Sequence, residues 1–264
     1  GELSLNITTG AETAVDLNPS SGNVHNLTIN DASADVNTDS ATTLAGDLTI
    51  TLGIFDIGNN GLTVTGTTTI GPNSGAADQA TLTCNASTVS LGAAYTSGYA
   101  LDVKRGGTFN GGSGTHTSGA LKVTTDSNAN AKLDLTSGNH TITAEYTSEN
   151  RFFELTTGTV THSNGTIILD DAVTAEIQWT ATTGDNGPYN LTLNDSGMTV
   201  SARSALNVEG NLTITAGTYT TFSPGGSADK DLTVGTNTDD NGATGHLLIL
   251  DDGELNCNSS TVIV

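Results

Sequence analysis

Positive charge and long apolar runs are both scarce in this sequence. Only 7 of the 264 residues are Lys or Arg, against 28 Asp or Glu, and the formal net charge is -21. A chain without a basic surface cannot neutralise phosphates, so the composition excludes nucleic-acid binding and disfavours contact with anionic membranes. The longest aliphatic run, residues 247–250, is far too short to span a bilayer, and we expect no membrane insertion.

Aromatic residues and residues with high helix propensity are also few. Aromatics make up 4% of the chain, and Thr, Gly, Asn, Ser and Asp are abundant. Apolar and polar residues alternate in Leu-Thr-Ile-Thr at 48–51, Leu-Thr-Val-Thr at 62–65 and Leu-Thr-Ile-Thr at 212–215. This period of two is typical of strands with one buried face, and an acidic disordered segment would not keep it. The sequence therefore predicts an all-β protein.

One long stretch of the chain occurs twice. Residues 25–55 align without a gap with residues 189–219, and residues 82–89 (LTCNASTV) match residues 255–262 (LNCNSSTV). Repetition on this scale indicates a stacked architecture. We expect residues 1–188 to form a first β-helix module and residues 189–264 to begin a second, homologous module that continues the same solenoid.

A shorter unit recurs within these modules. Two alternating apolar residues are followed by a glycine and another alternating stretch, as in residues 101–109, 133–142, 153–160, 212–219 and 248–255. A glycine at a fixed offset marks a backbone position that needs a positive φ or a close neighbour. We interpret each unit as one coil of a right-handed parallel β-helix (β-solenoid). A string of β-sandwich domains is the alternative, because strand spacing alone fits both folds.

The residue patterns of these coils resemble those of a known group of proteins. The phrases LTIT-x-G-T-Y, GTF-N-GGSGTH and NLT-[IL]-N-D are similar to the right-handed parallel β-helix segments of bacteriophage tail fibres, tailspikes and capsid-associated proteins, and of bacterial surface adhesins. The resemblance implies that fold, an extracellular location on a virion or cell surface, and often a trimeric assembly. It carries no catalytic residue to a named position here.

The two cysteines, Cys84 and Cys257, occupy equivalent places in the two repeats. Each alternates with a leucine, so we expect both to point inward as small apolar residues. Equivalent places in stacked modules lie several layers apart, which makes a disulfide between them unfavourable. Neither has a CxxC partner or an adjacent His, so no zinc site or nucleophile is expected.

The histidines give no pattern suited to a metal. We expect them to be surface or turn residues, because no two are spaced at i, i+2 or i, i+4. They are His25, His116, His140, His162 and His246. We therefore assign no catalytic, cofactor-binding or metal-binding residue.

Carboxylate clusters are the one candidate for hydrolytic or lyase chemistry. They are Asp170-Asp171 with Glu176, Asp239-Asp240, and Asp251-Asp252 with Glu254. A polysaccharide-degrading enzyme would need two acids in a groove, with Trp179, Tyr189 and Tyr219 as aromatic platforms. Residues 237–242 are dense in oxygen ligands and could hold Ca²⁺, but they match no known calcium-loop spacing. Solvated loops are the simpler explanation, because a run of acids in a Gly/Asn-rich turn is usually solvated and these clusters do not recur at the repeat offset.

Thr-x-Thr pairs suggest a further alternative, an ice-binding array on a solenoid face. The pairs are Thr49/Thr51, Thr63/Thr65, Thr67/Thr69, Thr141/Thr143, Thr159/Thr161 and Thr213/Thr215. Their irregular spacing favours the simpler interpretation, in which Thr is the ordinary outward residue of a strand.

The sequence thus favours a structural role over an enzymatic one. We expect a non-enzymatic segment of an extracellular or virion fibre, or a capsid decoration, that contacts a host surface or glycan. Residues 259–264 form a bare apolar strand, which should pair with more of the same chain or with another subunit. A homo-oligomer, in particular a trimer, is expected, and we expect the chain to be a processed form or an excerpt of a longer protein.

Overall fold

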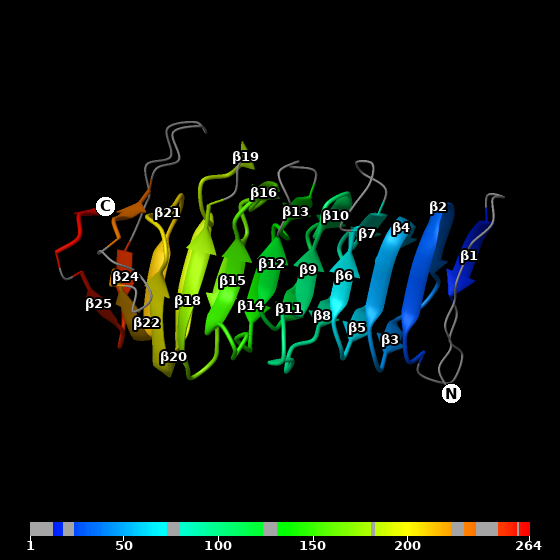
Figure 1. Ribbon diagram of the computed structural model, residues 1–264. Helices are drawn as coiled ribbons and strands as arrows, with labels where there is room; N and C mark the ends of the chain where they lie inside the picture. The colour runs from blue at the N-terminus through cyan, green and yellow to red at the C-terminus, as the bar shows by residue number, and fades with distance from the viewer. Residues whose placement is uncertain are drawn as a thin grey trace.

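The computed structural model describes residues 13–17, 24–72, 80–123, 131–180, 183–222, 230–235, 248–257 and 259–264. Within these residues all regular elements are β-strands, and the chain coils around one axis as a solenoid (Figure 1). Strand β1 and strand β25 lie at opposite ends of the stack (Figure 1).

The strands stack into three ladders that run along the solenoid. The first ladder contains the first halves of β2 (Leu27–Thr38) and β4 (Leu48–Asp56), then β6 (Thr68–Ile70), β9 (Leu101–Val103), β12 (Leu121–Val123), β15 (Arg151–Leu155), β18 (Thr174–Trp179), the later halves of β20 (Asn190–Ala202) and β22 (Leu212–Thr220), and β25 (Glu254–Asn256). The second contains β1 (Thr13–Leu17), the later halves of β2 and β4, β7 (Ala80–Thr83), β10 (Gly107–Asn110), β13 (Lys132–Asp134), β16 (Thr159–Thr161) and β19 (Thr183–Gly184). The third contains β3 (Thr42–Leu44), β5 (Leu62–Val64), β8 (Val89–Leu91), β11 (His116–Ser118), β14 (Asn139–Ile142), β17 (Thr166–Leu169), the first halves of β20 and β22, and β24 (Leu248–Leu250).

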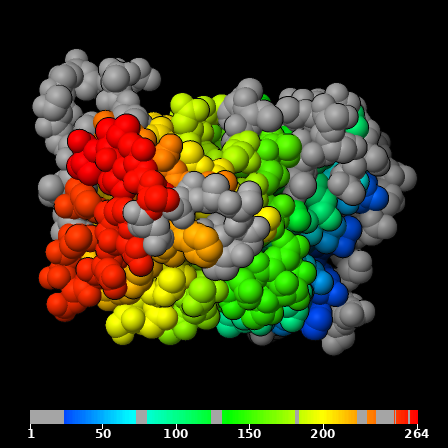
Figure 2. All heavy atoms as spheres, turned by 60° about the vertical axis from the view of Figure 1, so that its left-hand side comes forward, coloured from blue at the N-terminus to red at the C-terminus, as the bar shows by residue number. Residues whose placement is uncertain are grey.

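A small separate sheet joins β21 (Leu206–Val208), β23 (Leu232–Val234) and β26 (Val262–Ile263). Residues near the C-terminus cover one end of the stack (Figure 2). Every pairing among the named strands is parallel, in the main sheet and in the small one. Hairpin-built sandwiches are antiparallel, so the solenoid prediction is confirmed and the β-sandwich alternative is wrong.

The core is a set of columns of inward side chains. In the first ladder, Leu27, Leu48, Leu101 and Leu121 occupy matching registers and are 0–1% exposed. Burying one such side chain contributes about 1.5–3 kcal/mol relative to exposure. Because the alternate residues point outward, the Leu-Thr-Ile alternation in the sequence specifies which face of each strand is buried.

Asn and Asp side chains stabilise the corners that precede strands of the first ladder and, in the repeat, strands of the third. Asn26 Oδ1 accepts a hydrogen bond from the Asp47 N–H (2.8 Å), and Asp47 Oδ1 accepts one from the Thr67 N–H (2.8 Å). In the repeat, Asn190 Oδ1 accepts one from the Asn211 N–H (2.9 Å). Each bond satisfies a backbone donor of the next coil where the chain turns.

The two copies of the repeat have the same local structure. Register shifts fall at matching places, at Ile29/Asn30 and Asn30/Asp35 between β2 and β4, and at Leu193/Asn194 and Asn194/Thr199 between β20 and β22. The matching glycines Gly53 and Gly217 have φ of 98° and 87°. A Cβ at either would lie 2.5 Å from the carbonyl oxygen of Asp31 or Asp195, respectively. The glycine is therefore required at this turn in both copies.

The copies nevertheless lie on different sides of the solenoid. Residues 27–29 pair in the first ladder, whereas their equivalents, residues 191–193, pair in the third. Between the two copies the chain therefore completes several whole coils and then moves on to a different ladder. The division into modules 1–188 and 189–264 stays a prediction.

The cysteines are both free thiols. Cys84 is fully buried, as expected, and burial raises the pKa of its thiol above the range in which a thiolate forms. Cys257 is half-buried.

We expect Gly53→Ala and Gly217→Ala each to lower the free energy of unfolding by about 3 kcal/mol, because both add a strained φ and a clash with a carbonyl oxygen. Gly61→Ala is the matched control. A Cβ there meets its nearest atom at 3.6 Å, and we expect a change within about 0.5 kcal/mol. Urea unfolding followed by circular dichroism measures the difference, and equal effects of all three changes would contradict this account of the turn.

Candidate functional site

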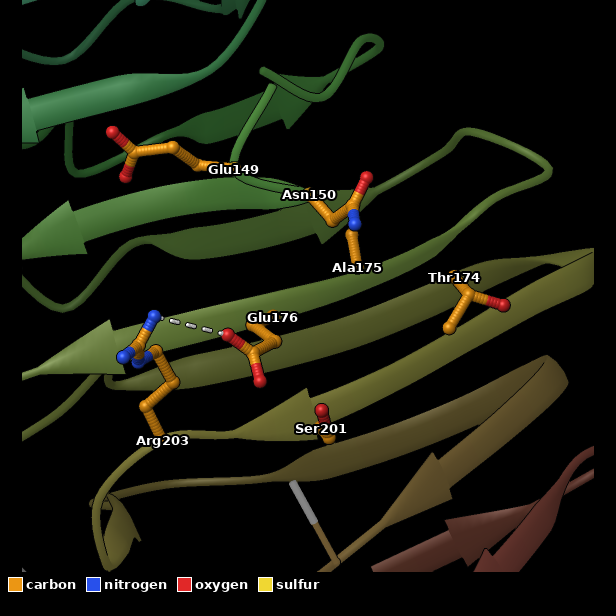
Figure 3. A pocket seen from close by; sticks show the side chains of 7 residues that line it. All are labelled: Glu149, Asn150, Thr174, Ala175, Glu176, Ser201 and Arg203. Atoms are coloured by element: carbon orange, nitrogen blue, oxygen red, sulfur yellow. Dashed lines mark ion pairs between the residues drawn. The ribbon is translucent and has the colours of Figure 1, made fainter. Parts of the chain in front are cut away.

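A polar hollow of about 610 Å³ opens on the outer side of the first ladder. Its lining comes from three successive coils, and Figure 3 shows the side chains around it. They are Glu149, Asn150, Thr174, Ala175, Glu176, Ser201 and Arg203. Six of the seven carry hydrogen-bonding groups, so the hollow is suited to a polar ligand.

One wall of the hollow belongs to one of two loops that pack on each other. They are residues 92–100 and 143–150, and the Thr147 N and Oγ1 both donate to the Thr96 carbonyl oxygen (3.2 and 2.9 Å). The second loop ends in two residues that line the hollow. The first loop contributes no lining residue and contacts the hollow only through the second.

An ion network anchors the wall to the ladder. Arg151 pairs with Glu149 (2.9 Å) and with Glu154, and the Tyr99 hydroxyl donates to Glu154 (2.6 Å). Lys122 Nζ lies 4.8 Å from the centroid of the Tyr99 ring and 3.6 Å from Glu154. Burial alone would raise the pKa of Glu154, but Tyr99, Lys122 and Arg151 together lower it. The carboxylate at the centre of the network is therefore held in its charged form.

Three uncharged polar groups in the hollow make no side-chain hydrogen bond to the described residues. They belong to Asn150, Thr174 and Ser201. Ser201 is only 3% exposed, and Asn150 has an unusual positive φ of 51°. Glu176 and Arg203 form an ion pair of 3.4 Å beside them (Figure 3). These groups can offer both donors and acceptors to a ligand.

The structure separates the acids that the sequence grouped together. Glu176 lines the hollow, whereas Asp170 and Asp171 lie at the preceding corner of the coil, outside the lining. The pKa of Asp171 is raised by burial and by repulsion from Asp195 and Asp170, although backbone hydrogen bonds partly oppose this. Glu149, which shares the hollow with Glu176, was not among the predicted acids.

The predicted aromatic platforms do not flank the hollow. Trp179 and Tyr219 are 4% and 1% exposed and belong to the core. Tyr189 is half-buried and packs 5.2 Å from the His162 ring, elsewhere on the solenoid. None of the described residues that line the hollow is aromatic.

The other predicted acids have no part in this site. Asp251, Asp252 and Glu254 are exposed. Asp239, Asp240, the possible Ca²⁺ segment at 237–242 and His246 lie outside the described residues.

The expectation of surface histidines is wrong for three of them. His116, His140 and His162 are 1%, 1% and 6% exposed, while His25 is exposed. His116 and His140 are neighbours in the third ladder and occupy inward positions that Val89 and Ile167 hold in adjacent coils. Each of these two histidines alternates with polar residues in the same way as the inward-pointing aliphatic residues do. This alternation is the signal in the sequence that could have predicted their burial in the core.

The buried pair His116 and His140 is held neutral. Burial lowers the pKa of His116 to about 4, and burial together with the His116 charge lowers that of His140 to about 3. His140 Nε2 lies 2.8 Å from Ser118 Oγ, whose proton goes to the Gly119 carbonyl, so Nε2 is the donor. Neither nitrogen of His116 has a partner in good hydrogen-bond geometry, and the Gly111 backbone opposes its pKa shift only partly.

A second cluster brings His162 together with Asp185 and Glu209. Their ligand atoms all lie within 4.8 Å of one another, with His162 Nε2 at 3.0 Å from Glu209 and 3.5 Å from Asp185. The sequence missed this group because its members come from three different coils. One histidine and two carboxylates are a plausible ligand set for a transition metal.

The hydrogen bonds of His162 indicate that the two carboxylates surround the proton on its Nε2 atom and not a metal ion. The Asn164 N–H donates to His162 Nδ1 (2.9 Å), so Nδ1 carries the lone pair and the proton of the neutral ring is on Nε2, facing Glu209. A metal at Nε2 would require the proton on Nδ1, directly against that N–H.

The Thr pairs are spread over all three ladders. Thr49 and Thr69 lie in the first, Thr159 in the second and Thr63 in the third. The third ladder does carry one regular outward column, formed by Thr43, Thr63, Ser90, Thr117, Thr141, Ile168, Thr192 and Thr213. The pairs do not combine into one continuous two-column face, which gives the ice-binding alternative no added support.

Comparison with known proteins adds no relative, since no family model, curated protein or solved structure matches this chain. None of the described residues belongs to a helix long and apolar enough to cross a membrane.

We expect the His116/His140 pair to make the protein less stable in mild acid. The unfolded histidines gain protons below pH 6.5 and the folded ones do not, so the free energy of unfolding falls as pH drops from 6.5 towards about 4 and 3. Between pH 7 and pH 5 the pair accounts for a loss of about 4 kcal/mol. The double variant His116→Leu/His140→Leu should lose much less over this interval in urea titrations. An unchanged pH dependence would show that the pair is not responsible.

The tautomer of His162 can be read by long-range ¹H–¹⁵N NMR. We expect Nε2 to be protonated and Nδ1 to have the chemical shift of an unprotonated acceptor nitrogen. His140 serves as an internal comparison, because it too is expected to carry its proton on Nε2. A protonated Nδ1 in His162 would reverse the argument and leave Nε2 open to a metal.

Proposed function

We propose that this chain is a non-enzymatic structural and surface-recognition element, a segment of an extracellular or virion fibre that contacts a host surface or glycan. A phage tail fibre, a capsid decoration and a bacterial adhesin are forms of this proposal. A homo-oligomer, in particular a trimer, is part of it.

The observation that carries the proposal is a lateral polar hollow on a continuous parallel ladder. The first ladder runs from β2 to β25, and its hydrogen bonds follow the solenoid axis, which suits a stiff spacer. The hollow lies on the side of this spacer, where a partner can reach it without disturbing the core. Stiffness and lateral access are what a fibre segment with a recognition site requires.

A polysaccharide-degrading enzyme is the rival from another class. It is favoured by the presence of two carboxylates, Glu149 and Glu176, in one hollow. Each of them is ion-paired, with Arg151 and Arg203 respectively. Both carboxylates are thus already engaged by an arginine, which supports recognition over cleavage.

Both functions can be tested on one set of polysaccharides from bacterial surfaces. We expect the protein to co-sediment with at least one of them and to release no new reducing ends after prolonged incubation. Release of reducing ends that is lost in Glu176→Gln but kept in the exposed control Glu254→Gln would establish the enzyme instead. Absence of any binding to these polysaccharides or to intact cells would remove the recognition role.

A further inference from the structure

We infer that the hollow on the first ladder binds an uncharged saccharide, in preference to a uronate, a sialylated glycan or an amino sugar. The inference rests on the proposed recognition function and adds to it the chemical class of the ligand.

The charged groups of the hollow are already neutralised within the protein. Glu149 is paired with Arg151 at 2.9 Å, and Glu176 with Arg203 at 3.4 Å. An anionic sugar would approach Glu149 and Glu176 in the hollow and a chain with net charge -21. A cationic sugar would approach Arg203, which lines the same hollow. In both cases the added charge meets a like charge that is already paired within the protein.

The uncharged groups, in contrast, make no side-chain hydrogen bond to the described residues. The Ser201 side chain is nearly enclosed, at 3% exposure, and its hydroxyl makes no hydrogen bond within the part of the chain that is described. A ligand hydroxyl that replaces solvent in the hollow can bond to it. The Asn150 amide and the Thr174 hydroxyl belong to exposed residues that border the same hollow (Figure 3), where they too can exchange solvent for a ligand. Closely spaced donors and acceptors of this kind match the adjacent hydroxyls of a sugar ring.

The paired charges contribute to the same recognition. Oxygens of Glu176 can accept hydrogen bonds from sugar hydroxyls, and the guanidinium of Arg203 can donate to sugar oxygens, without either group leaving its partner. Because none of the described lining residues is aromatic, binding depends on hydrogen bonds and not on stacking. We expect such binding to be weak and insensitive to salt.

The test compares three oligosaccharides of similar length by isothermal titration calorimetry and saturation-transfer NMR. They are a neutral gluco- or manno-oligosaccharide, an oligo-uronate, and a glucosamine oligomer with free amino groups. Each is measured at about 50 mM and about 500 mM NaCl, since charge-driven binding is screened over this range. We expect the neutral ligand to bind with a Kd that is the same at both salt concentrations.

Variants locate the binding. Ser201→Ala should weaken binding of the neutral oligosaccharide about two- to tenfold, as expected for the loss of one hydrogen bond. The matched control Ser90→Ala, a partly exposed position in the third ladder, should leave it unchanged. If Ser201→Ala does not fold, the exposed Thr174→Val tests the same hollow.

Each outcome has a distinct meaning. Preference for the uronate or for the glucosamine oligomer would overturn the inference and leave the recognition function standing. Neutral binding that survives both Ser201→Ala and Thr174→Val would place the ligand elsewhere, again overturning the inference alone. Failure of all three ligands, together with failure to bind intact cells, would overturn the inference and the proposed function.

Discussion

The structure depends on one constraint: each coil must hydrogen-bond in parallel register to the coils before and after it. Neighbouring strands then lie about 4.8 Å apart, and each side chain has as its nearest neighbours the residues at the same position in adjacent coils. Leucines stack on leucines, His116 meets His140, and hydroxyl side chains form a column along the third ladder. A polar residue in an inward position is buried whatever its own preference, because the backbone register allows it no other place.

Alternation and turn glycines were sufficient to predict the fold, because both are local. Leu-Thr-Ile patterns specify which face is buried, and a glycine such as Gly53 marks a turn that no other residue fits easily. The ladder partners were not predictable, because coil length varies. Twenty residues separate Leu101 from its partner Leu121, and 32 separate Leu121 from Phe153. Without the register, the histidines looked isolated and the threonines looked irregular.

The candidate site was harder to predict for the same reason. Only Glu176 among its lining residues was singled out in the sequence, and it was grouped with Asp170 and Asp171, which lie at a corner outside the hollow. Part of the lining comes from the end of the loop 143–150, which packs on residues about fifty positions earlier through contacts such as that between Thr147 and Thr96. No local pattern reports that such loops meet. Asn adopts a positive φ more readily than most residues, as Asn150 does here, but the residue type alone does not show which of the many asparagines will do so.

The rotation of the repeated segment changes what duplication can do for this molecule. Two copies on the same side of a rod could engage one flat surface together, and the second contact would then benefit from a high effective concentration. Here residues 27–29 and 191–193 lie in different ladders, so their shared turn geometry is presented in different directions. The duplication therefore lengthens the rod without giving it avidity for a single plane, and a partner that reads this turn would meet only one copy at a time.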